Sequence, residues 1–125
     1  MAQHHLLGKE GETMALEYLE KNGFRVLEKN WRYLKAEVDL IAMKDEMLVV
    51  IEVKTRATDY FGEPEEAVTT AKQKLLSDAA NAFLQMNNLD HEVRFDIISI
   101  ITNHAEKKLH HITDAFYPFS SELDG

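Results

Sequence analysis

The stretch "EVDLIAMKDEMLVVIEVKTR" (37–56) carries charged residues where a buried strand would carry valine or isoleucine. Asp39 and Glu52 are separated by an apolar hairpin sequence, and Lys54 follows Glu52 by two positions. Burying a charge is costly unless the charge is paired or binds an ion. The stretch therefore indicates either a cation-binding site or a set of salt bridges.

The spacing of these residues predicts how they meet. Side chains alternate along a strand, so Glu52 and Lys54 share one face of their strand. If residues 45–46 form a two-residue turn, Asp39 lies directly opposite Glu52, with β-carbons roughly 5 Å apart. Two carboxylates at that distance repel each other unless a positive charge lies between them.

Mg²⁺ suits this pair of acids because it prefers oxygen ligands and commonly takes only one or two carboxylates, keeping water and substrate phosphate. The chain has no cysteine, and no histidine stands at ligand spacing beside the acids, which argues against structural zinc. Mg²⁺ or Mn²⁺ held here would polarise a phosphoryl oxygen and lower the pKa of a bound water. Lys54 would stabilise the transition state or help position the attacking water. This chemistry is metal-dependent phosphodiester hydrolysis.

The alternative is a hairpin with surface salt bridges, in which Lys54 pairs with Glu52. The sequence "LVVIEVK" (48–54) argues against it, because this strand is apolar on both faces, as is typical of a central strand. Solvent-exposed charged side chains are less expected on such a strand.

Length and composition limit the class of protein. With 125 residues, 45% of them hydrophobic, we expect a single domain over residues 1–125. The N-terminus lacks the apolar run of a signal peptide, and no segment approaches the roughly 20 apolar residues that span a bilayer. These features predict a soluble cytoplasmic protein without a membrane partner.

The charge balance gives a mixed indication about nucleic acid. The formal net charge of −8 argues against a simple electrostatic nucleic-acid binder. Residues 21–35, however, hold five basic residues against one glutamate. A local basic surface on an acidic protein and an ordinary mixed surface both remain open.

Periodicity predicts the elements that position the acids. Residues 9–22 are predicted to form a helix that stops at Asn22-Gly23, and a second helix over 71–87 opens with a Thr70/Gln73 capping box. Strands are expected at 24–31, 37–43, 47–54, 92–102 and 107–113. This order predicts an α/β domain with a small mixed sheet. The predicted buried face of the second helix comprises Ala71, Leu75, Leu76, Ala79, Ala82 and Phe83.

Asp39 followed by Ile51-Glu52-Val53-Lys54 is similar to the PD-(D/E)xK signature of the restriction-endonuclease-like nucleases. Further blocks of the chain, in family order over residues 8–102, resemble the YraN-like family of predicted endonucleases, which is related to archaeal Holliday-junction resolvases. These blocks are "GKEGETMALEYLEKNGFRVLEKNWR", "EVDLIA", "VVIEVKTR", "FGEPEEAV", the helix beginning near Lys72, and "RFDIISI".

The resemblance implies a restriction-endonuclease-like fold, a mixed central sheet flanked by helices. It implies that Asp39, Glu52 and the carbonyl of Val53 are metal ligands and that Lys54 is the catalytic lysine. It also implies a catalytic acid on the first helix, at the position of Glu12. An alternative for Glu12 is an acid favoured by the helix dipole.

Two local features accompany this assignment. Gly8 and Gly11 would allow the first helix to approach the sheet closely, with Glu12 pointing inward. Where the family carries glycine before its E-[IV]-D triplet, this chain has Ala36, which leaves every proposed ligand in place.

The resemblance implies DNA as the partner, in branched or single-stranded form, and a two-fold homodimer, because resolvases make paired cuts. Phosphate contacts are expected from Arg32, Arg56, Lys72 and Lys74. Two other classes stay open: a nucleic-acid-binding domain of the same fold with little or no catalytic activity, and an interaction domain whose acids are structural. Asp96 is expected to pair with Arg94 or with a basic residue near the site.

Overall fold

A computed structural model describes residues 2–58 and 68–117, with side chains described from residue 8 onward. The sequence block "FGEPEEAV" lies outside the described residues except for Val68. The elements are α1 (Ala2–Lys21), β1 (Arg25–Tyr33), β2 (Ala36–Lys44), β3 (Met47–Arg56), α2 (Thr70–Met86), β4 (Glu92–Thr102) and β5 (Lys107–Phe116).

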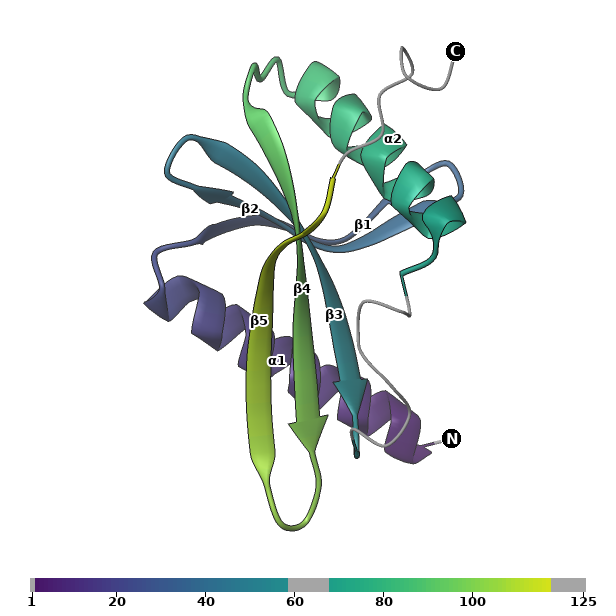
Figure 1. Ribbon diagram of the computed structural model, residues 1–125, viewed down its shortest axis with the longest axis vertical. Helices are drawn as coiled ribbons and strands as arrows, with labels where there is room; N and C mark the ends of the chain where they lie inside the picture. The colour runs from purple at the N-terminus through teal and green to yellow at the C-terminus, as the bar shows by residue number, and fades with distance from the viewer. Residues whose placement is uncertain (1, 59–67, 118–125) are drawn as a thin grey trace.

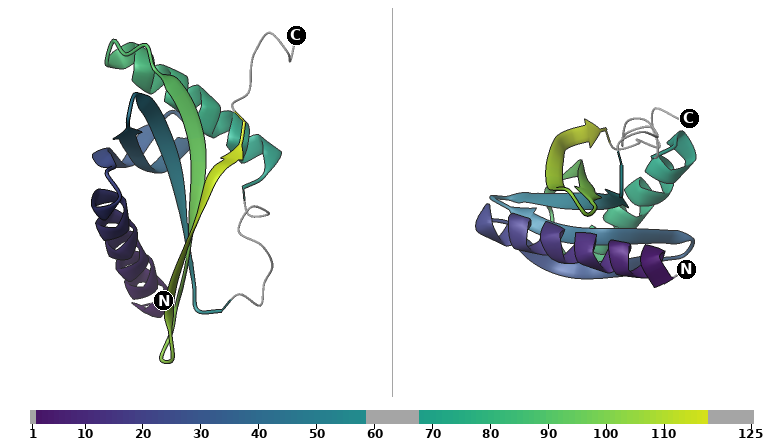
Figure 2. Two further views of the ribbon diagram at one scale, coloured as in Figure 1. Left: turned by 60° about the vertical axis from the view of Figure 1, so that its left-hand side comes forward. Right: turned by 90° about the horizontal axis from the view of Figure 1, so that it is seen from below.

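The described strands form a five-stranded mixed sheet in the order β1-β2-β3-β4-β5. Neighbouring strands pair antiparallel except β3 and β4, which are parallel and are connected through α2. The sheet is strongly twisted, and α1 and α2 cover its opposite faces (Figures 1 and 2). This is an α/β fold consistent with the restriction-endonuclease-like architecture.

Two apolar clusters, one on each face of the sheet, hold the layers together. One packs α1 through Ala15 and Leu19 against strand residues such as Ile51. The other packs α2 through Leu76 and Phe83 against the opposite face. The third strand is central in the sheet, and residues 48–51 are fully buried. The prediction of a central strand from its two apolar faces is thus confirmed.

The end of α1 is fixed by its own sequence. Gly23 adopts a φ of 83°, a conformation that glycine accepts at little cost. Phe24 N donates to Leu19 O (2.9 Å) and Gly23 N donates to Glu20 O (3.3 Å), which together form a Schellman motif. The predicted stop is confirmed, whereas the helix begins at Ala2, earlier than the predicted residue 9.

The start of α2 differs from the prediction by one residue. Thr69, rather than Thr70, is the N-cap, and its Oγ1 accepts a hydrogen bond from Lys72 N (3.2 Å). Gln73 does not complete a capping box, because its side chain donates to Val68 O instead (3.1 Å). The predicted buried face is correct for Leu76, Ala79, Ala82 and Phe83, but Ala71 and Leu75 are exposed.

The hairpin of β2 and β3 has the predicted register. Lys44 pairs with Met47 around a two-residue turn, and the pairing continues to Leu40 and Ile51. This register directs Asp39 toward Glu52. No helix in the described part of the chain is long and apolar enough to cross a membrane.

Candidate functional site

Asp39 and Glu52 lie where the ladder between β2 and β3 ends. The recorded backbone pairing stops at Leu40 and Ile51, and the next two residues interact through their side chains. Asp39 Oδ2 accepts a hydrogen bond from Val53 N (2.8 Å), and Asp39 N donates to Glu52 Oε2 (3.4 Å). The structure therefore brings Asp39, Glu52 and Val53 together, as the resemblance implied.

Glu52 is almost completely buried and carries an ion pair that the sequence did not predict. Its side chain is 3% exposed, and its Oε1 lies 2.6 Å from Lys72 Nζ. Lys72 extends from the first turn of α2, which the Thr69 cap holds in place. An ammonium group thus occupies a position beside the acidic pair, where positive charge was expected from a metal ion.

Burial and the neighbouring Glu52 carboxylate raise the pKa of Asp39 to about 7, while the hydrogen bond from Val53 N and the charge of Lys72 oppose the shift. Burial lowers the pKa of Lys72, but the hydrogen bond and charge of Glu52, together with the charges of Asp39 and Glu37, outweigh it and raise the pKa overall. The site as a whole favours added positive charge.

A hollow of about 440 Å³ opens beside the acidic pair. Figure 1 shows the turn between β1 and β2 next to the start of α2, the two segments that wall this hollow. Ala71 and Leu75 belong to the wall, which explains why these apolar residues are not in the core. The hollow is lined by Lys35, Ala36, Glu37, Asp39, Thr69, Ala71, Lys72, Leu75 and Leu76.

Ala36, at the position of the family glycine, is buried in this wall. It is not among the described residues with positive φ, so this backbone does not require glycine there. The residue with positive φ at this turn is Leu34 (φ 53°), which is 86% exposed. The substitution of alanine for the family glycine is therefore accommodated without backbone strain.

Lys54 is half-buried near the end of β3, on the side of the strand that strand alternation gives to Glu52. It forms no ion pair with a described side chain. The partner of Glu52 is Lys72 instead. The alternative in which Lys54 neutralises Glu52 is therefore not what this structure contains. Lys54 stays available for a role that depends on a ligand.

Glu12 lies on α1 and is half-exposed, and its Oε1 accepts a hydrogen bond from Asn30 Nδ2 (3.3 Å). Within the described residues, no three histidine, cysteine or acidic side chains lie close enough together to hold a metal ion. Glu12 accordingly does not complete a three-acid cluster with Asp39 and Glu52. Close approach of α1 to the sheet does occur at Gly11, whereas a side chain at Gly8 would meet no described residue within 4 Å.

The remaining predicted phosphate contacts are dispersed. Arg32 is exposed and pairs with Glu37 across the β1–β2 hairpin (2.9 Å), beside the hollow. Lys74 is exposed and lies 3.8 Å from Asp78 on the same helix. Arg56 is half-buried at the last residue of β3.

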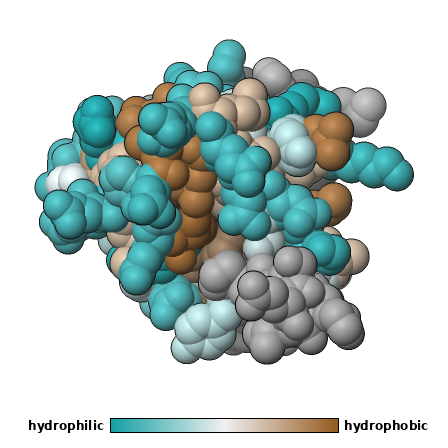
Figure 3. Space-filling model, turned by 90° about the horizontal axis from the view of Figure 1, so that it is seen from above, coloured by the Kyte–Doolittle hydropathy of each residue, from teal (hydrophilic) through white to brown (hydrophobic). Residues whose placement is uncertain are grey.

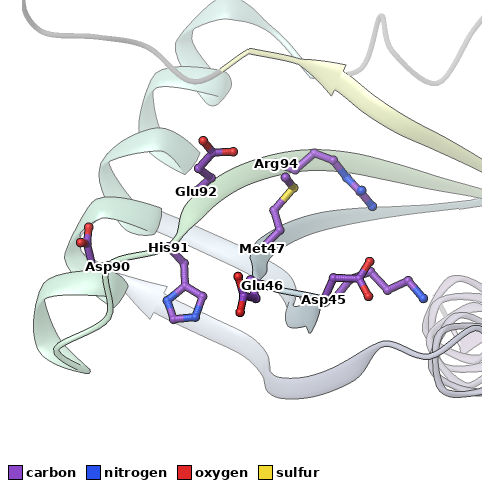
Figure 4. Close-up of a pocket in the computed structure, with 8 residues that line it drawn as sticks. Asp45, Glu46, Met47, Asp90, His91, Glu92 and Arg94 are labelled. Carbon is purple, nitrogen blue, oxygen red and sulfur yellow. The ribbon is translucent and has the colours of Figure 1, made fainter.

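Two larger hollows lie at the other end of α2, and neither is built like the acidic site. Figure 3 looks onto this end and shows a band of hydrophobic residues between hydrophilic ones. A hollow of about 700 Å³ here includes Trp31, Phe83 and Met86. In the adjoining hollow of about 580 Å³, Asp45, Asp90 and Glu92 point in different directions rather than toward a common point (Figure 4).

Comparison with known proteins supports a family assignment. Residues 11–100 match the model of the uncharacterised protein family UPF0102. The chain is similar to the UPF0102 protein FP2501 of Flavobacterium psychrophilum, with 48% identity over 119 residues, covering 95% of this chain and 100% of that protein. A UPF0102 protein of Bacteroides thetaiotaomicron is 44% identical over 118 residues, covering 94% of this chain and 98% of the relative. These names state a family and no activity.

Proposed function

This chain belongs to the uncharacterised protein family UPF0102, and we propose that it is a metal-dependent DNA endonuclease in which Asp39 and Glu52 bind Mg²⁺ or Mn²⁺. The observation that carries the proposal is the buried carboxylate of Glu52, held beside Asp39 where β2 and β3 separate and a hollow opens. A buried glutamate beside a half-buried aspartate is costly in a purely structural role.

The donor set fits a hard divalent cation. Two carboxylates and the nearby backbone of Val53 offer oxygen ligands only, and Mg²⁺ in proteins is commonly held by one or two carboxylates with water and phosphate completing its shell. The Lys72 ammonium, 2.6 Å from Glu52, is further support, because it marks this point as one that attracts a cation. Among the described residues no third acid lies close enough to complete a three-ligand cluster with them, which is compatible with such a sparse ligand set.

When bound, the cation would supply Lewis-acid activation of a phosphodiester and of its attacking water. Asp39 and Glu52 would hold it, with Asp39 oriented by the hydrogen bond from Val53 N. Lys54, half-buried and without an ion pair among the described side chains, would stabilise negative charge developing on the phosphate. The hollow between the β1–β2 turn and α2 would receive the phosphate backbone.

A second candidate is a nucleic-acid-binding domain of this fold with little or no catalytic activity. It is favoured by two observations: Glu52 already has a cationic partner in Lys72, and Glu12 contacts Asn30 rather than joining the acidic pair. Binding and cleavage must therefore be measured separately.

A cleavage assay with Mn²⁺ on four-way junction, flap, single-stranded and duplex DNA tests the proposal. Branched or single-stranded DNA is included because of the resemblance to resolvases. We expect cleavage of at least one substrate by the wild type, loss of cleavage in EDTA, and loss in the Asp39→Asn variant. Asp78→Asn, an exposed acid on α2, is the control and should cleave normally.

The outcomes separate the two candidates. Binding of DNA without cleavage of any substrate would favour the binding domain. Cleavage that persists in Asp39→Asn would show that another site or a contaminating nuclease is responsible.

A further inference from the structure

The most unexpected contact in the site is the ion pair between Lys72 and Glu52. Glu52 is nearly inaccessible, with 3% of its side chain exposed, while the Lys72 side chain is 39% exposed. The lysine therefore reaches in from the solvent side, and the acid does not reach out. At 2.6 Å the ammonium group donates a direct hydrogen bond to Glu52 Oε1.

The backbone of Lys72 is anchored, whereas its side chain is partly exposed to solvent. Lys72 N donates to the side chain of its own N-cap, Thr69, so the first turn of α2 is well anchored. The side chain itself has a long flexible stem, and it borders the hollow beside Asp39. Among the described residues, the ammonium group forms an ion pair only with Glu52.

A divalent cation and this ammonium cannot share Glu52 without penalty. A cation coordinated by Asp39 and Glu52 would lie a few ångströms from Lys72 Nζ, at a distance where like charges repel strongly in a partly buried site. Binding of a divalent cation at Glu52 would therefore favour departure of the ammonium. The ammonium is the more exposed partner, and the hollow gives it a place to go.

We propose that Lys72 is an exchangeable counter-ion, which neutralises Glu52 in the metal-free protein and is displaced toward a substrate phosphate when a divalent cation binds. The proposal rests on the metal site of the proposed function and assigns Lys72 a positioning role. The expected phosphate contact of Lys72 then belongs to the metal-bound state, and the Glu52 contact to the metal-free state.

The displaced ammonium would lie at the border of the hollow, where Lys35 also contributes positive charge. A phosphate entering there would meet both lysines. Metal binding would consequently strengthen phosphate binding, because it releases a cation that was occupied by Glu52. A lysine with a purely structural role would not produce this coupling.

Metal titration of purified variants tests the exchange directly. Lys72→Gln keeps a hydrogen-bonding group but removes the charge, Lys72→Arg keeps the charge, and Lys74→Gln removes a charge from the same helix outside the hollow. Measured by calorimetry with Mn²⁺ alone, affinity should rise about tenfold or more in Lys72→Gln, because the competing charge is gone. It should stay within about twofold of wild type in Lys72→Arg and Lys74→Gln.

A second readout uses binding of a labelled single-stranded oligonucleotide in Ca²⁺ and in EDTA. Wild type should bind more tightly with Ca²⁺, and Lys72→Gln should show a smaller gain although it binds metal more tightly. Opposite changes in metal and DNA affinity distinguish exchange from simple loss of structure. Lys108→Gln, which changes an exposed lysine on β5 that is assigned no part in DNA binding, is the control and should keep the gain.

The wild-type protein also reports on the exchange without any variant. Lysine side-chain NMR in the absence of DNA should show the Lys72 signal shifting as Mg²⁺ saturates the site, with the Lys74 signal unchanged. A Lys72 signal that stays in place at saturating Mg²⁺ would overturn the proposal. This measurement holds even if Lys72→Gln does not fold.

The outcomes separate this inference from the proposed function. If wild type binds Mn²⁺ and Lys72→Gln binds it equally or more weakly, the exchange is wrong and the metal site stands. If neither protein binds Mn²⁺, the metal site fails and the exchange fails with it. If Lys72→Gln binds Mn²⁺ and wild type does not, Lys72 blocks the site instead of exchanging with the cation, and the exchange is wrong.

Discussion

At the residue scale, the two acids of the site are compensated in different ways. Glu52 has a full positive charge at 2.6 Å, whereas Asp39 has mainly a backbone hydrogen bond from Val53 N. Removing the charge of Glu52 would relieve its repulsion of Asp39 but would also leave Lys72 without its partner. The two effects on stability would therefore offset each other. Removing the charge of Asp39 has no such offset.

Asp39→Asn should stabilise the metal-free protein at pH 8 by about 1–2 kcal/mol, because a partly buried carboxylate is replaced by a neutral group of the same shape. Asparagine can still accept the hydrogen bond from Val53 N. Urea unfolding in EDTA measures the change. Adding Mn²⁺ should stabilise wild type and leave the variant unchanged.

The stabilisation expected from Asp39→Asn depends on pH in a definite direction. The folded carboxyl of Asp39 keeps its proton up to a pKa of about 7, while the unfolded carboxyl loses it near 3.8. Between these values the folded state binds more protons, so wild-type stability falls as pH rises. The advantage of Asp39→Asn should thus grow from pH 5 to pH 8, and a constant advantage would contradict this account.

The acidic pair could be predicted from the sequence, but the lysine that neutralises Glu52 could not. Strand alternation and a two-residue turn are local rules, and they put Asp39 beside Glu52. The contact of Lys72 joins the first turn of a helix to a strand twenty residues earlier in the chain. No periodicity connects them, so Lys54, the nearer lysine, was the natural partner to expect.

At the element scale, the position of α1 on the sheet depends on one glycine. A side chain at Gly11 would overlap the side chain of Thr55 on β3, whereas one at Gly8 would have none of the described residues within 4 Å. The sequence indicated that both glycines allow close approach. Only the packed structure distinguishes them, because the distance between a helix and a sheet is a tertiary property.

Gly11→Ala should destabilise the protein by about 1–3 kcal/mol, because α1 must shift away from β3 or Thr55 must change rotamer. Gly8→Ala should be neutral or stabilising by up to about 1 kcal/mol, since alanine favours the helix. Thermal unfolding of this matched pair measures both. Equal effects of the two substitutions would show that α1 is not held closely at Gly11.

Element boundaries followed the strength of their local signals. The glycine after α1 is a strong stop, and the stop was predicted correctly. Two adjacent threonines are equally good N-caps, so the sequence does not separate the predicted Thr70 from the actual N-cap, Thr69. Likewise Ala71 and Leu75 follow the apolar period of α2 but line the hollow instead of the core.

At the scale of the whole molecule, the mixed character of the sheet could be predicted and the full strand order could not. A helix between β3 and β4 allows the long crossover that parallel pairing needs. Short connections between β1 and β2, and between β2 and β3, favour antiparallel hairpins. The short connection between β4 and β5 also favours an antiparallel hairpin, and a buried polar network joins these two strands to α1.

That network centres on Asp96, which is fully buried on β4. Arg94 binds it through two hydrogen bonds (2.9 and 2.8 Å), which confirms the expected pair. His111 Nε2 on β5 lies 2.7 Å from Asp96 Oδ2, and His111 Nδ1 lies 2.9 Å from the hydroxyl of Tyr18 on α1. The backbone N–H of Asp114 also donates to Asp96 (3.0 Å). One carboxylate thus connects α1, β4 and β5.

Asp96→Asn should destabilise the protein by about 3–5 kcal/mol at pH 7, because it removes the charge that compensates a largely buried guanidinium. Burial raises the pKa of Asp96, but hydrogen bonds from His111, Arg94 and the Asp114 N–H outweigh it and lower the pKa below 3.8. In acid the unfolded state then takes up the proton first, so the contribution of Asp96 is present above about pH 4–5 and is lost as pH falls through the folded pKa.

Urea unfolding between pH 7 and pH 2.5 should show wild type losing its advantage over Asp96→Asn as the solution is acidified, with Asp78→Asn as the exposed control. An advantage that persists at the lowest pH would mean that shape and packing, rather than the charge of Asp96, join the three elements.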